Sequence, residues 1–233
     1  HCEFGVVANP DSVVQGLHEA SVSKKPSDAL RRNKEDFVKS RKVVDAHGTL
    51  NVAKICNYLN IHSDKDAIFT NGAGNFAIWS GKYLNYSKEH RLLAPQAGAM
   101  GAGVPAALAA KSIYPNRQVI CFAGDGDFQM SASELGTAMQ EGLNPIILIH
   151  NNGSYGTIRM HQEMRYPKRV SGTNLKNPNF KCIAEAYNFG YSKITNLSEF
   201  KVAFEKAKTI DVGFIIEMLA DIKDISPGKI IDL

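Results

Sequence analysis

Two short apolar runs joined by a helix-forming segment constrain the fold of this chain more than any other feature. The runs cover Gln118–Ala123 and Pro145–His150 and are mostly apolar. Runs of this kind are typical of strands covered on both faces, as in a parallel sheet. Between them, Ser131–Glu141 is rich in helix formers, and Ser131 with Glu134 fits a helix-capping pair. Strand, helix and strand at this spacing indicate a βαβ unit.

The chain continues this alternation on both sides of the unit. Further strands are predicted at Ala67–Thr70, Leu92–Ala94, Tyr191–Ile194 and Gly213–Leu219. Helices are predicted at Val44–Leu59, 76–84, Gly98–Ile113, Phe180–Tyr187 and Ser198–Lys208. The predicted fold class is α/β, an open, doubly wound parallel sheet with helices on both faces. The many glycines and alanines of 98–113 predict close packing of that helix against another backbone.

The first part of the chain departs from this pattern. Phe4–Ala8 is typical of a strand and Ser12–Ala20 of a helix, which together are too little for a core, so we expect residues 1–20 to be the tail of a truncated middle domain. Residues 21–42 are predicted to be a basic linker, either solvated chain or a surface helix, because lysine and arginine outnumber acids there. Residues 43–233 form the main predicted domain.

Composition argues against several classes of function. The chain has 44% hydrophobic and 21% charged residues, as in ordinary soluble domains, and no apolar run nears the ~20 residues that span a bilayer. The basic linker lacks interleaved aromatic residues, which disfavours nucleic-acid binding. Neither C-x-x-C nor H-x-x-x-H occurs, which disfavours a disulfide framework or a zinc site. Without a signal-peptide pattern, we expect a cytoplasmic protein bound to neither membrane nor nucleic acid.

Small, oxygen-bearing residues follow both central runs. Gly124-Asp125-Gly126 ends the first run and Asn151-Asn152 ends the second. Ligands of doubly wound sheets bind at the carboxyl ends of strands, so Asp125 and Asn152 are predicted to be neighbours. A carboxylate and an amide oxygen suit Mg²⁺, which takes its other ligands from phosphate and water. The N–H groups that open the following helix suit a phosphate. The residues therefore indicate a site for Mg²⁺ and a diphosphate.

Other interpretations of the Gly-Asp-Gly motif fit less well. A Rossmann fingerprint requires a third glycine where Gln129 stands, and the G-K-[ST] of a P-loop is absent. An EF-hand that starts at Asp125 requires glycine and glutamate where Met130 and Gly136 stand. A tight turn with an asparagine cap and no ligand explains Gly-Asp-Gly alone, but leaves the paired asparagines unexplained.

These stretches resemble the thiamine diphosphate-dependent enzymes of the acetolactate synthase and benzoylformate decarboxylase group. Their cofactor motif is similar to GDGDF…HNN of this chain. Other parts of the same domain are similar to three further stretches, QAGAMGAGVPAALAAK (96–111), TNGAGNFAIW (70–79) and NNGSYGTIR (151–159). The end of their middle domain resembles ANPDSVVQGL (8–17). The resemblance implies a thiamine diphosphate-binding fold, with 43–233 as the C-terminal cofactor (pyrophosphate)-binding domain.

The resemblance implies roles for individual residues. Mg²⁺ would be ligated by the side chains of Asp125 and Asn152 and by the main-chain carbonyl of Ser154. Met100 matches the apolar residue that supports the bent cofactor. Asp127 departs from the usual Ser or Ala, and suits a diphosphate only if its side chain points away or toward the metal. The implied cofactor-binding residues are Gly74, Asn75, Phe76, Gly98, Met100, Gly124, Gly126, Asp127, Tyr155, Gly156 and Thr157.

The implied activity is that of a decarboxylase or carboligase similar to acetolactate synthase. In such enzymes the C2 ylid of the cofactor attacks a 2-oxo acid, CO₂ is lost, and the acyl carbanion passes to an acceptor. The alternatives are another lyase of the benzoylformate, oxalyl-CoA or aldehyde type, and a non-catalytic binding module. The family's activating glutamate belongs to a separate N-terminal domain that nothing here resembles, so no catalytic residue is expected in this chain. Glu134 and Glu141 are interpreted as helix-surface acids. Activity should require the missing domain and a homodimer or homotetramer.

The predicted substrate pocket comprises Thr157, Ile158 and His161. His161 stands where acetolactate synthases carry a tryptophan, which is a departure from that activity. Arg159, His161 and Gln162 are candidates to bind a carboxylate or polar acceptor, and a surface helix turn with a solvated arginine is the alternative. The residues after them, 163–174, are predicted to form a mobile loop that can serve as a lid.

Overall fold

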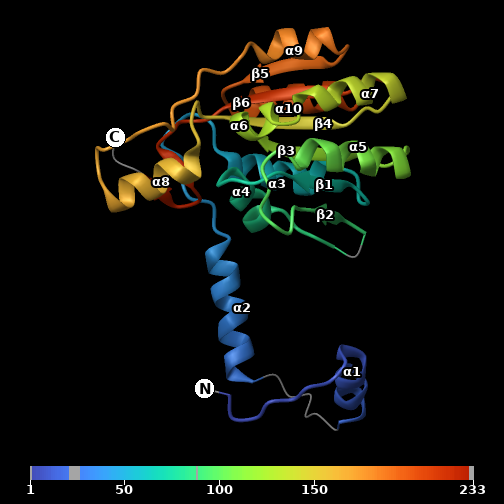
Figure 1. Cartoon of the computed structure of the whole chain (residues 1–233), viewed down its shortest axis with the longest axis vertical. Coiled ribbons are helices and arrows are strands. Elements are labelled where there is room, and N and C mark those ends of the chain that lie inside the picture. Colours follow the sequence, from blue (N-terminus) through green and yellow to red (C-terminus); the bar gives the residue numbers. More distant parts are fainter. Residues whose placement is uncertain (1, 21–26, 88, 231–233) are drawn as a thin grey trace. The chain divides into compact units, whose positions relative to one another are not determined.

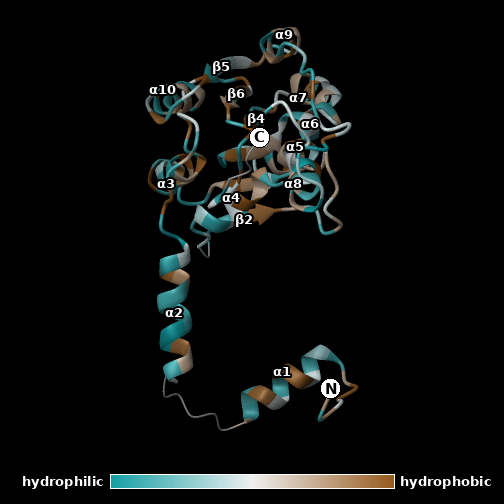
Figure 2. Cartoon of the chain, turned by 90° about the vertical axis from the view of Figure 1, so that its left-hand side faces the viewer, coloured by the Kyte–Doolittle hydropathy of each residue, from teal (hydrophilic) through white to brown (hydrophobic). Residues whose placement is uncertain are grey.

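The structure, a computed structural model, describes residues 2–20, 27–87 and 89–230. Its internal contacts divide the chain into two units, 1–42 and 43–233. The first unit contains helices α1 (Pro10–Glu19) and α2 (Asp28–Ser40), neither of which has a buried residue. Most of α2 is hydrophilic (Figure 2), in agreement with a surface helix. The assignment of residues 1–20 to a preceding domain stays a prediction.

The predicted strand at Phe4–Ala8 is wrong, because the structure gives these residues no regular conformation. A strand requires a neighbour for its backbone N–H and C=O groups, and no strand of the described residues pairs with this segment. Part of the predicted linker, residues 21–26, lies outside the described residues.

The second unit is built on a parallel sheet with the strand order β2-β1-β3-β4-β6-β5. In Figure 1 the sheet runs from β5 at the top to β2 at the bottom. Its strands are β1 (Ile68–Asn71), β2 (Arg91–Leu93), β3 (Val119–Gly124), β4 (Ile146–Asn151), β5 (Gly190–Ile194) and β6 (Phe214–Leu219). A separate antiparallel pair consists of β7 (Asp224–Ser226) and β8 (Lys229–Ile230).

Helices cover both faces of the sheet (Figure 1), which confirms the predicted fold class. One face is covered by α3 (Val52–His62), α4 (Phe76–Tyr83) and α10 (Leu197–Ala207). The other face is covered by α5 (Gly103–Ile113), α6 (Asp125–Gln129), the short 3₁₀ helix η1 (Ala132–Glu134), α7 (Leu135–Glu141) and α9 (Phe180–Ala186). Helix α8 (Gly156–Arg165) has no buried residue and lies beyond the end of the sheet.

The two cores explain why the central strands are almost continuously apolar. Side chains of a strand alternate between the faces of a sheet. Phe122 therefore packs into the core under α3, α4 and α10, whereas Cys121 and Ala123 pack into the opposite core. In the same way, Leu148 and Ile149 of β4 belong to different cores. Because both faces are buried, these strands lack the alternating polar residues that a solvated face would show, and the polar residues of β4, His150 and Asn151, stand at its carboxyl end.

Helix α5 packs directly against the backbone of β1, as its composition predicts. A Cβ atom on Gly103 would lie 2.6 Å from the backbone nitrogen of Gly72 and 2.9 Å from the carbonyl carbon of Asn71. The predicted start of this helix is too early, because Gly98 and Gly101 have φ angles of +62° and +83°. Such left-handed residues form turns and cannot continue a right-handed helix.

The predicted helix at Val44–Leu59 also begins too early, since α3 starts at Val52. The preceding segment is extended chain and turns that are held to the C-terminal part of the unit. The N–H groups of His47 and Gly48 donate to the two carboxylate oxygens of Asp224. Asn51 then caps α3 by accepting the N–H of Lys54. These long-range contacts, rather than local sequence, set the start of the helix.

The predicted capping role of Ser131 is wrong. Its side chain makes no capping hydrogen bond, and its hydroxyl oxygen has no partner among the described residues. The N–H of Ser131 donates to the carbonyl of Phe128, so this residue continues the turn that begins in α6. Helix α7 is therefore entered through η1 rather than through a free N-cap.

Candidate functional site

A cleft lies where β3 and β4 end. Its walls come from the turn between β1 and α4, from the start of α6, from the turn between β4 and α8, and from β7. The lining residues are Ala73, Gly74, Asn75, Phe76, Trp79, Met100, Gly124, Asp125, Gly126, Asp127, His150, Asn152, Ser154, Tyr155, Gly156, Thr157, Ile158 and Ile225. The cleft is thus at the carboxyl edge of the sheet, where ligands of doubly wound sheets bind.

Asp125 is the central acid of the cleft. It follows β3 directly, is 2% exposed, and accepts the N–H groups of Gly126 at 3.0 Å and Gly153 at 2.8 Å. The side-chain amide of Asn177 donates to the same carboxylate at 2.7 Å. Burial raises the pKa of Asp125 despite these hydrogen bonds. Within the described residues no lysine, arginine or histidine forms an ion pair with it, so a bound cation would stabilise the charged carboxylate.

The turn after β4 brings Asn152 next to Asp125. β3 and β4 are adjacent and parallel, with Gly124 paired with His150. The hydrogen bond from Gly153 to Asp125 joins this turn to the end of β3. The side-chain oxygen of Asn152 accepts the N–H of Ser154 at 3.0 Å. The predicted metal ligands thus lie on two turns that are held together, although no group of three or more His, Cys, Asp or Glu side chains among the described residues forms a metal cluster.

Asp127 is directed at the two turns beside the cleft. Its Oδ1 atom accepts the N–H groups of Ala73 at 3.1 Å and Gly101 at 2.8 Å. Gly72 makes room for it, because a Cβ atom there would overlap the carboxylate. Burial raises the pKa of Asp127, and the backbone N–H groups oppose that shift. The acid that departs from the family pattern is therefore engaged by backbone N–H groups and ties together the turns 72–74 and 98–101.

Asn75 and Thr157 connect two further walls of the cleft. The Thr157 hydroxyl accepts the N–H of Asn75 at 3.0 Å and donates to the Asn75 side-chain oxygen at 2.9 Å. The Asn75 amide donates to the carbonyl of Ile225 at 3.0 Å. The starts of α4 and α8 and strand β7 are thereby fixed relative to one another.

Arg159 and Gln162 are engaged within the protein. Arg159 pairs with Glu163 at 3.2 Å, with side chains only 11% and 8% exposed. Gln162 donates to the carbonyl of Ser171 and accepts the N–H of the same residue. Both side chains are thus engaged within the protein, and Arg159 is not a solvated surface residue. Their role in binding a carboxylate stays a prediction. The loop that follows α8 is held to this helix by these hydrogen bonds.

The structure brings most predicted site residues together. Every predicted metal ligand lines the cleft, as do all predicted cofactor-binding residues except Gly98. Thr157 and Ile158 of the predicted substrate pocket also line it. His161 lies exposed on α8 and does not line the cleft, and Gly98 lies exposed in its turn. The roles of all these residues stay predictions.

Sequence reasoning missed four residues of the cleft, Ala73, Trp79, His150 and Ile225. Trp79 and His150 are in ring contact with centroids 5.4 Å apart. Burial lowers the pKa of His150 to about 4, so its ring is neutral at neutral pH. No sequence signal distinguishes Trp79 or His150 from core residues, and Ile225 belongs to β7, which the apolar pattern does not predict.

Residues 72–218 match the family described as thiamine pyrophosphate enzyme, C-terminal TPP binding domain. The match covers more than half of the chain and contains both turns that carry Asp125 and Asn152. The chain therefore belongs to this family, and the predicted resemblance is confirmed.

Relatives within the family include acetolactate synthases. The chain is 37% identical over 128 residues to the acetolactate synthase of Arthrospira platensis, a match that covers 54% of this chain and 22% of that protein. It is 36% identical over 152 residues to the acetolactate synthase large subunit of Corynebacterium glutamicum, a match that covers 63% of this chain and 24% of that protein. The chain thus spans about a quarter of the length of these curated relatives.

A solved structure has the same fold. The thiamine diphosphate-dependent 4-hydroxybenzoylformate decarboxylase of Rhodococcus jostii RHA1 superposes with a TM-score of 0.71 and 26% identity. The superposition covers 77% of this chain and 34% of that protein. Among the described residues, no helix has both the length and the apolar character to cross a membrane.

Proposed function

We propose that this chain binds the diphosphate of thiamine diphosphate through Mg²⁺, and that it serves a 2-oxo acid decarboxylase or carboligase in the complete enzyme. One observation carries the metal site. Asp125 is a buried carboxylate at the end of β3, without a cationic partner among the described residues, and it is hydrogen-bonded to the turn that presents Asn152 and Ser154. Mg²⁺ favours such oxygen ligands and keeps phosphate oxygens in its remaining positions.

The chain's own residues would bind and orient the cofactor. Asp125, the amide oxygen of Asn152 and the carbonyl oxygen of Ser154 would hold the metal. The N–H groups of Gly126 and Asp127 open α6 and would face phosphate oxygens. The N–H of Gly126 donates to the Asp125 carboxylate in the structure, and it would exchange this bond for one to phosphate when Asp125 holds the metal. Met100 would support the cofactor in its bent form. When bound, thiamine diphosphate supplies a carbon nucleophile and an electron sink for decarboxylation.

The wall formed by α8 favours a substrate with an apolar side chain. Arg159 and Gln162 are engaged within the protein, and α8 presents Ile158 to the cleft. A straightforward test is product analysis of the complete enzyme with pyruvate, pyruvate plus 2-oxobutyrate, and an arylglyoxylate. Acetohydroxy acids as products would support a carboligase. CO₂ and an aldehyde would support a simple decarboxylase, the activity named for the solved structure from Rhodococcus jostii. Absence of any turnover by a cofactor-loaded enzyme would contradict both.

The remaining parts of the proposal concern the complete enzyme. The glutamate that activates the cofactor is expected in a separate N-terminal domain. Glu134 and Glu141 of this chain do not line the cleft, which agrees with their interpretation as helix-surface acids. We further propose a homodimer or homotetramer that works in the cytoplasm on a small-molecule substrate.

The cofactor part of the proposal has a separate test in calorimetry. Thiamine diphosphate is titrated into the metal-free complete enzyme and into its Asp125→Asn variant, each with Mg²⁺ and with EDTA. We expect Mg²⁺-dependent binding that weakens by at least about 100-fold in the variant, since the amide lacks the charge that holds the cation. Equal affinity of both proteins would contradict the assignment of Asp125.

A further inference from the structure

A network of polar side chains leads from Asp125 away from the cleft to the opposite half of the sheet. Asn177, in the segment before α9, donates one amide hydrogen to Asp125 at 2.7 Å and the other to the side-chain oxygen of Asn151 at 2.8 Å. Asn151, the last residue of β4, donates to Glu217 of β6 at 2.7 Å. The hydroxyl of Tyr191, on β5, donates to the other oxygen of Glu217.

The chemistry of these groups allows only one orientation of the two amides. A carboxylate accepts hydrogen bonds and donates none, so Asn151 must turn its NH₂ group toward Glu217. Its oxygen then faces Asn177 and the N–H of Gly153, which lies 3.2 Å away. Asn177 must therefore turn its NH₂ group toward Asn151 and Asp125. Its own oxygen accepts from Gln129 at 3.0 Å, which completes the pattern.

Glu217 is the carboxylate that fixes one end of this order, as Asp125 fixes the other. It is 4% exposed and does not line the cleft. Asn151 and Tyr191 donate hydrogen bonds to its carboxylate, and Lys193 supplies a positive charge, with its Nζ atom 3.8 Å away and its side chain 52% exposed. Burial, together with Glu217, raises the pKa of Tyr191, so its hydroxyl keeps the proton that it donates.

The network holds both halves of the predicted metal site. Asn177 fixes one oxygen of Asp125 directly. Asn151 and Asp125 both accept the N–H of Gly153, and this residue lies between Asn152 and Ser154. The orientation of Asn151 thus affects the turn that presents two of the predicted ligands as well as the carboxylate that supplies the third.

We propose that Glu217 is a positioning residue, which fixes the amides of Asn151 and Asn177 and thereby holds Asp125 and the Asn152–Ser154 turn in the arrangement that receives Mg²⁺. This inference rests on the proposed function. Hydrogen-bond partners of metal ligands affect metal affinity by about 10- to 100-fold when they are removed. An effect of that size is expected here from a residue two hydrogen-bonded side chains away from Asp125.

The test uses Glu217→Gln in the complete enzyme. The new amide can donate, so the orientation of Asn151 is no longer imposed. The metal-free protein with saturating thiamine diphosphate is titrated with Mg²⁺ and followed by calorimetry. We expect the apparent Kd for Mg²⁺ to rise by about tenfold, while kcat at saturating Mg²⁺ stays within about twofold. Glu185→Gln, the same change on the exposed surface of α9, should leave the Kd unchanged.

A double variant separates positioning from simple loss of structure. Glu217→Gln combined with Asn151→Asp exchanges donor and acceptor and keeps the total charge, so Asn177 and Gly153 again face an acceptor. We expect this variant to regain most of the Mg²⁺ affinity, whereas Asn151→Asp alone, which sets two carboxylates together, should not. A Glu217→Gln variant with wild-type Mg²⁺ affinity, or a double variant without rescue, would overturn the inference.

Two further outcomes are distinguishable. If Glu217→Gln does not fold, Asn177→Ala tests the same network at a partly exposed position of the segment before α9. It should also raise the Kd for Mg²⁺ by about tenfold, and an unchanged Kd would overturn the inference. If the wild-type enzyme binds thiamine diphosphate equally well with Mg²⁺ and with EDTA, the proposed function itself fails, and the positioning role fails with it.

Discussion

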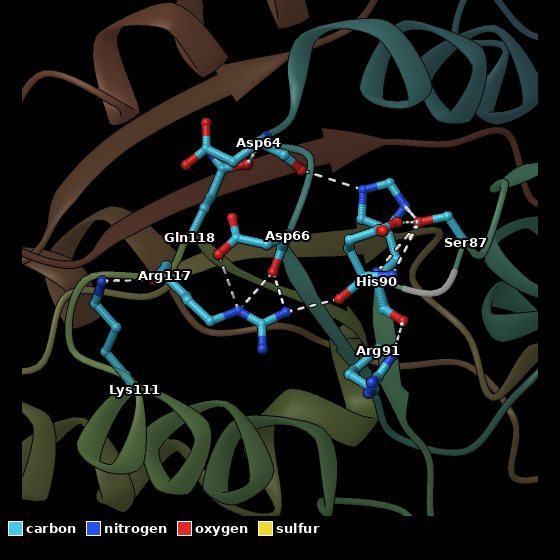
Figure 3. A network of polar contacts seen from close by, with 9 residues as sticks. Asp64, Asp66, Ser87, His90, Arg91, Lys111, Arg117 and Gln118 are labelled. Carbon is cyan, nitrogen blue, oxygen red and sulfur yellow. Dashed lines mark hydrogen bonds and ion pairs between the residues drawn. The ribbon is translucent and has the colours of Figure 1, made fainter.

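The two ends of the parallel sheet both carry charged side chains, but in opposite environments. At the amino end, Arg117 donates to the backbone carbonyl of Asp66, and a ring nitrogen of His90 faces the carbonyl of Asp64 (Figure 3). Arg117 also donates to the carbonyl of Glu89, and the other ring nitrogen of His90 faces the carbonyl of Asn85. These side chains are partly exposed, and they satisfy backbone acceptors. At the carboxyl end, the buried carboxylates of Asp125 and Asp127 accept backbone N–H groups, and neither forms an ion pair among the described residues.

The two environments differ in what they indicate about function. A charged group that ties down neighbouring loops in contact with water is explained by stability alone. A buried carboxylate is costly unless it is compensated, and hydrogen bonds from neutral N–H groups compensate it only in part, as the raised pKa values of Asp125 and Asp127 show. Mutations at the amino end should therefore change the stability of the protein only, whereas mutations at the carboxyl end should change both its stability and its binding of the cofactor.

The largest effect on stability is expected for Asp127→Ala. This change leaves the partly buried N–H groups of Ala73 and Gly101 without their acceptor, which costs about 3 kcal/mol. Urea unfolding should show this loss, and cofactor binding should weaken as well. The matched change at the amino end is Asp66→Ala, whose side chain is 55% exposed and should contribute less than about 1 kcal/mol. Equal losses of stability in the two variants would contradict the proposed difference between the two ends of the sheet.

Gly72→Ala should have the next largest effect on stability. Its methyl group would overlap the Asp127 carboxylate and force that buried side chain to move, at a cost of about 2 kcal/mol. Gly81→Ala is the control, because this helical glycine of α4 has nothing within 4 Å of its Cβ position. It should stabilise the protein by about 0.5–1 kcal/mol. Thermal unfolding of both variants checks the pair, and a Gly72→Ala protein as stable as wild type would contradict the described packing.

Arg117→Ala should lower stability by about 1.5 kcal/mol, since hydrogen bonds from a charged donor to the backbone are lost. The affinity for thiamine diphosphate should stay within about twofold, because Arg117 lies at the end of the sheet away from the cleft. Denaturation and calorimetry on the same preparation make the two measurements. A large loss of cofactor affinity would show that the two ends are not independent.

Cysteine labelling gives the smallest but most local signal. Burial raises the pKa of the Cys121 thiol to about 12, so at pH 8 it should react with iodoacetamide only when the sheet opens. The exposed Cys182 should react at once. Cys121 lies in the middle of β3, close to Gly103 and Gly72. Its labelling should therefore accelerate more in Gly72→Ala than in Arg117→Ala, and the reverse order would contradict this assignment.

The sequence predicted most of the fold for a physical reason. Strands such as β3 and β4 are buried on both faces, and burial leaves a continuous apolar run that needs no structural information to find. The boundaries at Val52 and Gly103 were missed, because long-range hydrogen bonds and left-handed glycines determine them. The strand β7 was missed because three residues carry no periodic pattern.

For the candidate site, local motifs predicted the metal turns but not the groups that hold them. Asp127 accepts backbone N–H groups that are far away in sequence. Because every residue except proline has such an N–H group, the identity of the side chain does not reveal the donor. Glu217 lies in an apolar run and carries no sign that it connects to Asp125. In contrast, Arg159 and Glu163 stand four residues apart on a helix, a spacing that favours an ion pair. That pair was available as a sequence signal against a substrate role for Arg159.

The most direct test of the account is the position of the metal. The complete enzyme is crystallised with thiamine diphosphate and Mn²⁺ in place of Mg²⁺, and the ion is located by anomalous scattering. We predict one peak at the end of β3 and β4, about 2 Å from oxygens of Asp125, Asn152 and Ser154. A peak ligated by Asp127 instead, or a bound cofactor without a metal at this edge of the sheet, would contradict the account.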